Sequence, residues 1–173
     1  QCPERYEMVT TNCLTGKACY YEEKNNPQRI IDIVRASSSL PFVCPIAYVD
    51  GIPMLDGGIT DSIPLLRAQS EGFTENNVVV LTRNRGYRKQ IKGTKVPPFI
   101  YRKYPLLREA INNRSKLYNE QLDLVERLED EGRITVIRPQ RPIEVDRIEK
   151  NIDKLTALYE EGYQLADGIR FEL

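Results

Sequence analysis

The residues of this chain that could do chemistry centre on one short run, Asp56-Gly57-Gly58. A carboxylate at the end of a strand can act as a general base if a partner hydroxyl can reach it. Glycines at positions 57 and 58 permit a close backbone approach, because they lack the Cβ that restricts other residues. The same tripeptide is also a common turn, in which aspartate caps its own backbone and glycine supplies a positive φ. Both interpretations are open on the tripeptide alone.

The chain contains no histidine, which restricts the chemistry available around Asp56. A Ser-His-Asp triad, a Cys-His pair and the usual imidazole metal sites cannot be assembled from these residues. No two of the four cysteines have the two-residue separation typical of zinc and redox motifs. We expect free thiols, with one disulfide or adventitious metal binding as the alternative. We also expect a cytoplasmic setting, no resident metal and no organic cofactor.

A serine nucleophile is the part that the sequence does not supply. The Gly-x-Ser-x-Gly pattern, which places a serine on a sharp strand-to-helix turn, occurs nowhere in the 173 residues. Ser37, Ser38 and Ser39 lack glycine neighbours, so we expect them to end a helix and to form loop hydrogen bonds. Asp61 is expected to cap the next helix or to lie in solvent, with an orienting role beside Asp56 as the alternative.

The elements that must position Asp56 are strands and helices in alternation, which indicate an α/β fold. Asp50-Gly51 between two apolar runs is typical of a hairpin, and this hairpin leads directly to Asp56. Four consecutive apolar residues at 78–81 indicate a strand that is buried on both faces of a largely parallel sheet. Strands are expected at 6–10, 18–22, 46–49, 52–55, 77–82 and 134–137, and helices at 27–36, 64–72, 102–129 and 145–166.

These features together resemble the patatin-like phospholipase family, in a bacterial branch. The resemblance rests on the order of the run Ala36-Ser37-Ser38-Ser39-Leu40-Pro41, the hairpin, and the run from Leu55 to Pro64. The upstream run from Val9 to Lys17 and the closing run Tyr159-Glu160-Glu161-Gly162-Tyr163 are also similar to segments of that family. The resemblance covers residues 1–70 well and the remainder loosely.

The resemblance implies a Ser-Asp dyad without histidine. Asp56 would accept the proton of a serine that attacks an ester carbonyl, Gly57 and Gly58 would support the loop, and water would release the fatty acid from the acyl-enzyme. Because the serine and the family's glycine-rich oxyanion loop are missing, we expect the carboxyl-terminal part of a longer lipid acyl hydrolase, inactive alone. The alternative is a noncatalytic α/β interaction module whose Asp-Gly-Gly is a structural turn.

The length and composition fit a single domain. With 40% hydrophobic and 29% charged residues, the 173 residues can bury one sizeable core, and the apolar runs are too short to span a membrane. We expect one domain over 1–173, with a motif-bearing region at 1–72 and an extension at 73–173. The expected fold is a partial patatin-like layered sheet, mostly parallel, with helices on its faces and a β-hairpin before the Asp-Gly-Gly loop.

The net charge is zero, but the basic residues gather in the middle of the chain. Residues 76–108 are rich in basic and aromatic side chains and contain no acidic residue. Three uses of this stretch are open: a solvated loop, peripheral contact with an anionic membrane surface, or a stacking platform for nucleic acid, which is the least expected. The basic residues that would contact anionic lipid are Arg83, Arg85, Arg88, Lys89, Lys92 and Lys95.

Overall fold

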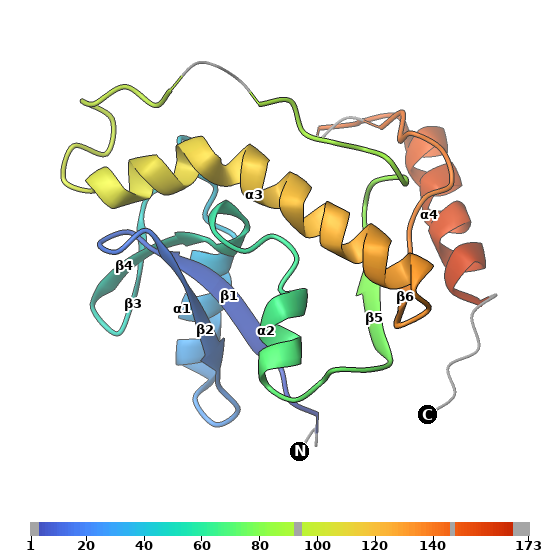
Figure 1. The fold of residues 1–173 in the computed structure, drawn as a ribbon. Helices are drawn as coiled ribbons and strands as arrows, with labels where there is room; N and C mark the ends of the chain where they lie inside the picture. The colour runs from blue at the N-terminus through green and yellow to red at the C-terminus, as the bar shows by residue number, and fades with distance from the viewer. Residues whose placement is uncertain (1–3, 92–94, 146–147, 168–173) are drawn as a thin grey trace. The chain divides into compact units, whose positions relative to one another are not determined.

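The computed structural model describes residues 4–91, 95–145 and 148–167, which form two compact units (Figure 1). Unit 1 comprises Gln1–Pro64 and Lys89–Gln121, and unit 2 comprises Leu65–Arg88 and Leu122–Leu173. The long helix α3 (Pro105–Asp130) contributes its first part to unit 1 and its last part to unit 2. A single domain over 1–173 stays a prediction.

Unit 1 is built on a four-stranded sheet with the order β2-β1-β4-β3. Its strands are β1 (Glu7–Asn12), β2 (Lys17–Glu22), β3 (Ala47–Val49) and β4 (Ile52–Asp56). All neighbours in this sheet run antiparallel, and Thr10 of β1 lies opposite Asp56 of β4. The expectation of a mostly parallel sheet is therefore not confirmed. Strands that are joined by short turns must run antiparallel, whereas parallel neighbours need a long crossover connection.

The hairpin predicted before Asp56 is present as β3 and β4. Asp50 and Gly51 both have positive φ angles, 51° and 76°. This pair of angles matches the type I′ turn, whose twist suits the strands of a two-residue hairpin. The Asp-Gly pair therefore sets the register that delivers the chain to Asp56.

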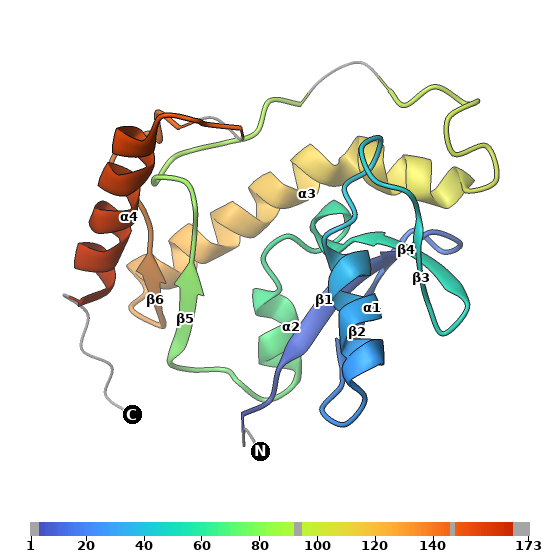
Figure 2. The same ribbon diagram turned by 180° about the vertical axis from the view of Figure 1, so that it is seen from behind.

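Helix α1 (Pro27–Ser37) lies on one face of this sheet, behind the strands in Figure 1 and in front of them in Figure 2. The side chain of Asn26 caps its start by accepting a hydrogen bond from the Arg29 N–H, and Pro27 occupies the first turn. Both features favour a helix that begins at this point, as the sequence predicts.

Strand β4 contributes to two apolar clusters. Met54 packs with Ile33 of α1, while the next residue, Leu55, packs with Leu107 of α3. Because successive side chains of a strand point to opposite faces, β4 is covered on both faces by helices of unit 1. The strand that ends in Asp56 is therefore held firmly in the core.

Unit 2 contains a sheet of two parallel strands, β5 (Asn77–Val80) and β6 (Ile134–Ile137), together with α2 (Leu65–Ser70), the end of α3, and α4 (Ile152–Asp167). Val79 is 9% exposed, but Val78 and Val80 are 42% and 70% exposed. The prediction of a strand buried on both faces is thus wrong within the described residues. The face of β5 that carries Val79 is buried, and the face that carries Val78 and Val80 is exposed.

Helix α4 begins later than the sequence pattern predicts, at Ile152 rather than near residue 145. The side chain of Asn151 accepts a hydrogen bond from the Lys154 N–H, which is typical of an N-cap. Ile148, which we expected in register with the helix, precedes it. No residue of α4 is buried. In the described part of the chain, no helix has the length and apolar character that a membrane crossing requires.

Candidate functional site

The backbone of Asp56 is held on two sides at the end of β4. Its N–H donates to the carbonyl oxygen of Ser39 at 2.9 Å, and its own carbonyl oxygen accepts from the Thr11 hydroxyl at 2.8 Å. The carboxylate is half-buried, and its Oδ1 atom accepts from the Gly58 N–H at 2.6 Å. These contacts fix both the backbone and the side chain of Asp56.

The serines before this loop end helix α1, as expected. The Ser38 hydroxyl donates to the carbonyl oxygen of Val34 and the Ser39 hydroxyl to that of Arg35. Ser39 is 5% exposed, and its carbonyl oxygen is the one that accepts from Asp56. Its observed role is to join the end of α1 to the end of β4.

Gly57 is required by a close approach between two backbones. It opens a short 3-10 turn, Gly57–Ile59, and a Cβ atom at this position would lie 2.3 Å from the carbonyl oxygen of Val9. At Gly58, an added Cβ would lie 3.0 Å from Oδ1 of Asp56. A side chain at 57 would push the loop away from β1, and one at 58 would crowd the carboxylate.

Two side chains of α3 fasten the loop that follows Asp56, which we call the Asp-Gly-Gly loop (residues 56–63). Arg114 donates from Nε to the carbonyl oxygen of Gly58 at 2.7 Å. Gln121 accepts the Ile63 N–H at its Oε1 atom, at 3.1 Å. Residues seven apart lie on one face of a helix, so a single face of α3 holds both ends of the loop.

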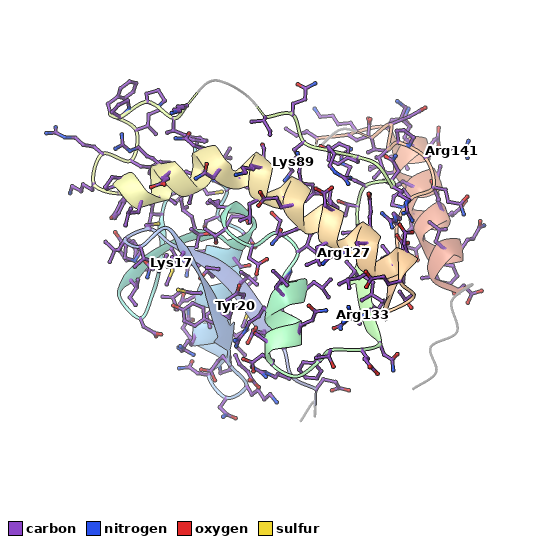
Figure 3. All side chains as sticks on the ribbon, viewed as in Figure 1. Lys17, Tyr20, Lys89, Arg127, Arg133 and Arg141 are labelled. Carbon is purple, nitrogen blue, oxygen red and sulfur yellow. The ribbon has the colours of Figure 1, made fainter. Side chains whose placement is uncertain are left out.

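Asp61 is the third anchor of the loop. Its Oδ2 atom accepts from the hydroxyl of Tyr20 at 2.6 Å, and its Oδ1 atom accepts from Nε2 of Gln121 at 2.5 Å. Tyr20 is labelled on β2 in Figure 3. Asp61 is half-buried rather than solvated, and its carboxylate joins β2 to α3. The expectation that Asp61 lies in solvent is therefore not met, and an orienting role beside Asp56 stays a prediction.

Sequence reasoning missed Tyr20, Arg114 and Gln121. Arg114 and Gln121 follow Leu107 at intervals of seven residues. Both polar side chains therefore lie on the helix face that the apolar pattern predicts to be buried. Buried polar groups need hydrogen-bond partners, and that is the signal that could have found them. Tyr20 carries no comparable signal, since aromatic residues are common in strands.

The arrangement offers one chemical capability, an oriented carboxylate that could accept a proton from a hydroxyl brought to it. Within residues 4–91, 95–145 and 148–167, no group of three or more His, Cys, Asp and Glu side chains could hold a metal ion. Cys13, Cys19 and Cys44 are free thiols. Cys2 lies outside the described residues.

Three of the basic residues expected to contact lipid lie in unit 2, and two of them are ion-paired. Arg85 binds Glu129 and Asp130 at 3.2 and 2.7 Å, and the guanidinium of Arg83 lies 5.1 Å from the Tyr87 ring centroid. The third, Arg88, forms ion pairs with the carboxylates of Asp123, at 2.6 Å, and Glu126, at 2.8 Å.

These ion pairs have an electrostatic consequence. The pKa of Glu126 is lowered to about 2, mainly by the hydrogen bond from Arg88 and to a smaller extent by the hydrogen bond from the Gly86 N–H. The charges of Arg85 and Arg88 are thus largely compensated by α3 side chains, so they contribute less to a cationic surface than their sequence position suggests.

The remaining basic residues of that prediction fall in unit 1 or outside the description. Lys89 is labelled in Figure 3. Its ammonium group lies 3.5 Å from the centroid of the Tyr118 ring, and its backbone N–H and carbonyl bind the Asn119 side chain. Lys95 is exposed. Lys92 lies outside the described residues.

Comparison with known families divides the chain into two matched segments. Residues 17–68 match the model of the patatin-like phospholipase family, and residues 104–169 match that of a domain of unknown function (DUF6363). No curated protein matches the chain. The first segment contains Asp56, Gly57 and Gly58, and the second contains Arg114 and Gln121. The bacterial branch stays a prediction. Residues 17–68, which carry the Asp-Gly-Gly loop, are thus similar to the patatin-like phospholipase family.

Proposed function

We propose that this chain is part of a serine lipid acyl hydrolase in which Asp56 is the general base of a Ser-Asp dyad. The observation that carries the proposal is the support of the Asp-Gly-Gly loop. Its backbone is tied to β1, to the end of α1 and to α3, within a segment that matches a family of lipid hydrolases. A general base has to be held in one geometry, and this loop is held from three elements.

In the proposed reaction, a serine hydroxyl gives its proton to the Asp56 carboxylate as its oxygen attacks an ester carbonyl. An acyl-enzyme and an alcohol result, and water then releases the carboxylic acid. Since the chain has no Gly-x-Ser-x-Gly run, the proposal takes the serine from an upstream part of the same protein. It follows that the isolated chain should not hydrolyse esters.

A noncatalytic interaction module is the second candidate, and one observation favours it. Oδ1 of Asp56 accepts a hydrogen bond from the Gly58 N–H two residues on, which is the bond expected of a purely structural Asx turn. This bond occupies Oδ1, and the proposed serine hydroxyl would bind the second carboxylate oxygen, so both candidates are compatible with this geometry. Activity measurements separate them.

The setting of the proposed enzyme is the cytoplasm, with peripheral contact to an anionic membrane surface and with a lipid or another ester as substrate. Three thiols that are unpaired in the described residues support a reducing compartment. We propose no nucleic-acid partner, because the ion-paired Arg85 and Arg88 weaken the basic stretch that suggested one.

The test compares the chain with the longer protein in cleavage of a chromogenic ester and of phospholipid vesicles. We expect the longer protein to be active and Asp56→Asn to lower its kcat by about 100-fold or more, as loss of a general base does. Asp153→Asn on the exposed surface of α4 is the matched control and should keep full activity. Circular dichroism and thermal melting establish that both variants are folded.

Two results would count against the proposal. A longer protein whose folded Asp56→Asn variant retains its activity would favour the noncatalytic role of the loop. Turnover by the isolated chain that Asp56→Asn abolishes would show that a nucleophile lies within these 173 residues.

A further inference from the structure

Two loops of unit 1, residues 40–44 and 95–103, meet through an aromatic pair. The backbone N–H of Phe42 donates to the hydroxyl of Tyr101 at 2.9 Å, and the two ring centroids are 5.7 Å apart. Phe42 and Tyr101 have φ angles of 70° and 51°, a region that bulky residues rarely adopt. Strained backbone of this kind persists only where surrounding contacts enforce it, and it is often found at functional sites.

The apolar side chains beside this contact point into solvent. Phe42 is 59% exposed, Val43 is 78% exposed and Phe99 is 77% exposed. These loops are nevertheless anchored to the core of unit 1, because Ile46 and Tyr101 pack against the cluster that contains Leu107. Large apolar groups held in water by a rigid support are typical of a surface that meets an apolar partner.

The charges of the same loops are of one sign. Lys95, Arg102 and Lys103 are exposed, and within the described part of the chain none of them forms an ion pair. No acidic residue occurs between 33 and 49 or between 76 and 108. Arg85 and Arg88 differ in this respect, because both are occupied by carboxylates of α3.

We propose that Phe42, Val43, Phe99, Lys95, Arg102 and Lys103 form a docking surface for an anionic lipid bilayer. Aromatic and aliphatic side chains would enter the headgroup region, and each uncompensated basic residue would be attracted by the negative surface potential. An uncharged apolar partner would not explain the absence of acidic residues from both loops. This assignment moves the membrane contact from the paired arginines to residues that have no carboxylate partner.

The docking surface adjoins the candidate site along the chain. The loop at 40–44 begins directly after Ser39, whose carbonyl oxygen binds the Asp56 N–H at 2.9 Å. A bilayer bound at this loop would bring ester groups toward Asp56. Only the delivery of ester groups to Asp56 rests on the proposed function, since membrane binding itself needs no serine.

The experiment measures binding of the chain to vesicles of phosphatidylcholine with and without phosphatidylglycerol. We expect binding that needs the anionic lipid and weakens with salt. Replacing the three apolar residues (Phe42→Ser, Val43→Ser, Phe99→Ser) or the three basic ones (Lys95→Gln, Arg102→Gln, Lys103→Gln) should weaken it by about tenfold or more. Matched controls are Ile148→Ser with Ile152→Ser, and Lys116→Gln with Arg127→Gln and Arg133→Gln, all exposed elsewhere.

A second measurement does not depend on the folding of the triple variants. The chain contains no tryptophan, so Phe99→Trp introduces a single fluorescent reporter. Its emission should shift to the blue on anionic vesicles and should be quenched by brominated lipid. The matched reporter Val80→Trp, at a position that is 70% exposed on β5, should show neither change.

Several outcomes would overturn the inference. They are no binding to anionic vesicles, binding lost only in the Ile148 and Ile152 variant, and a Phe99→Trp reporter that stays in water on bound vesicles. Self-association that the Phe42, Val43 and Phe99 changes abolish, without vesicle binding, would assign the surface to a protein partner instead. The Asp56→Asn variant should bind vesicles like the unaltered chain, so failure of the catalytic proposal and failure of this one are distinguishable.

Discussion

Nε of Arg114 donates a 2.7 Å hydrogen bond to the carbonyl oxygen of Gly58 and so ties helix α3 to the Asp-Gly-Gly loop. Arg114 belongs to the segment that matches a domain of unknown function, whereas Gly58 belongs to the patatin-like segment. Within unit 1, the two matched segments are therefore parts of one structure. The beginning of the second segment helps to hold the candidate catalytic loop of the first.

Replacing Arg114 by leucine should loosen the loop. Among the described residues, the Gly58 carbonyl would keep only the Ser62 hydroxyl as a side-chain donor, so we expect a loss of about 1–2 kcal/mol in the free energy of unfolding. Arg127→Leu is the matched control on the same helix. Its side chain is 66% exposed with a carboxylate at 3.9 Å, and its change should cost less than about 0.5 kcal/mol. Urea titration of both variants measures the difference, and equal losses would contradict the anchoring role.

Replacing Gly57 by alanine should be among the most costly single-methyl additions in unit 1. The added Cβ would lie 2.3 Å from the Val9 carbonyl oxygen, and we expect a loss of about 3 kcal/mol as the loop and β1 move apart. Gly162→Ala adds the same methyl group within α4, where the new Cβ would meet no atom within 4 Å other than its chain neighbours and the adjacent backbone of the helix. It should raise helix stability by roughly 0.5–1 kcal/mol. Thermal melting that shows the same sign for both changes would refute the close approach at Gly57.

Replacing Tyr20 by phenylalanine removes one of the two donors to Asp61. A half-buried carboxylate would lose a 2.6 Å hydrogen bond, and we expect a loss of about 1–2 kcal/mol in the free energy of unfolding. Tyr21→Phe on the same strand is the control, because the ring of Tyr21 keeps its contact with Arg29 without the hydroxyl. In the longer protein, Tyr20→Phe should also lower kcat with little change in KM. Unchanged kcat would limit Asp61 to a structural role.

The pairing of Glu126 with Arg88 should appear in the pH dependence of stability. The pKa of Glu126 is about 2 in the folded chain against an ordinary value of 4.5. The stabilisation is fully present above about pH 4.5 and is lost as the pH falls toward 2. Glu126→Gln should therefore lower stability at pH 7 by roughly 1 kcal/mol, and the difference from the unaltered chain should shrink between pH 4.5 and pH 3. Urea unfolding across this pH range measures the difference in stability, with Glu120→Gln as the exposed control.

The free thiols should differ in reactivity. Cys13 is 0% exposed, and burial raises its pKa to about 12. Iodoacetamide reacts with the thiolate, so at pH 8 Cys19 and Cys44 should be alkylated about 100-fold faster than Cys13. Peptide mapping by mass spectrometry separates the sites, and labelling in urea, where the rates should become similar, is the control. Rapid labelling of Cys13 in the native chain would contradict its place in the core.

Local signals predicted much of the fold of unit 1 and little of its sheet geometry. The Asp50-Gly51 turn, the Asn26-Pro27 helix start and the serines that end α1 each act over a few residues, and each was confirmed. The pairing of β1 with β4 joins residues more than forty positions apart, and no local pattern encodes it. The apolar run at 78–81 was misread because burial of a strand depends on what covers its faces, which the run itself does not contain.

The sequence by itself determined the composition of the candidate site: Asp56 with two glycines, no histidine, and no Gly-x-Ser-x-Gly run. These are properties of residue type and spacing, and the family match at residues 17–68 depends on nothing else. The tertiary structure decided which side chains hold Asp56 in place. Arg114 and Gln121 reach the loop across more than fifty residues of chain, because hydrogen bonds depend on distance in space and not on separation in sequence.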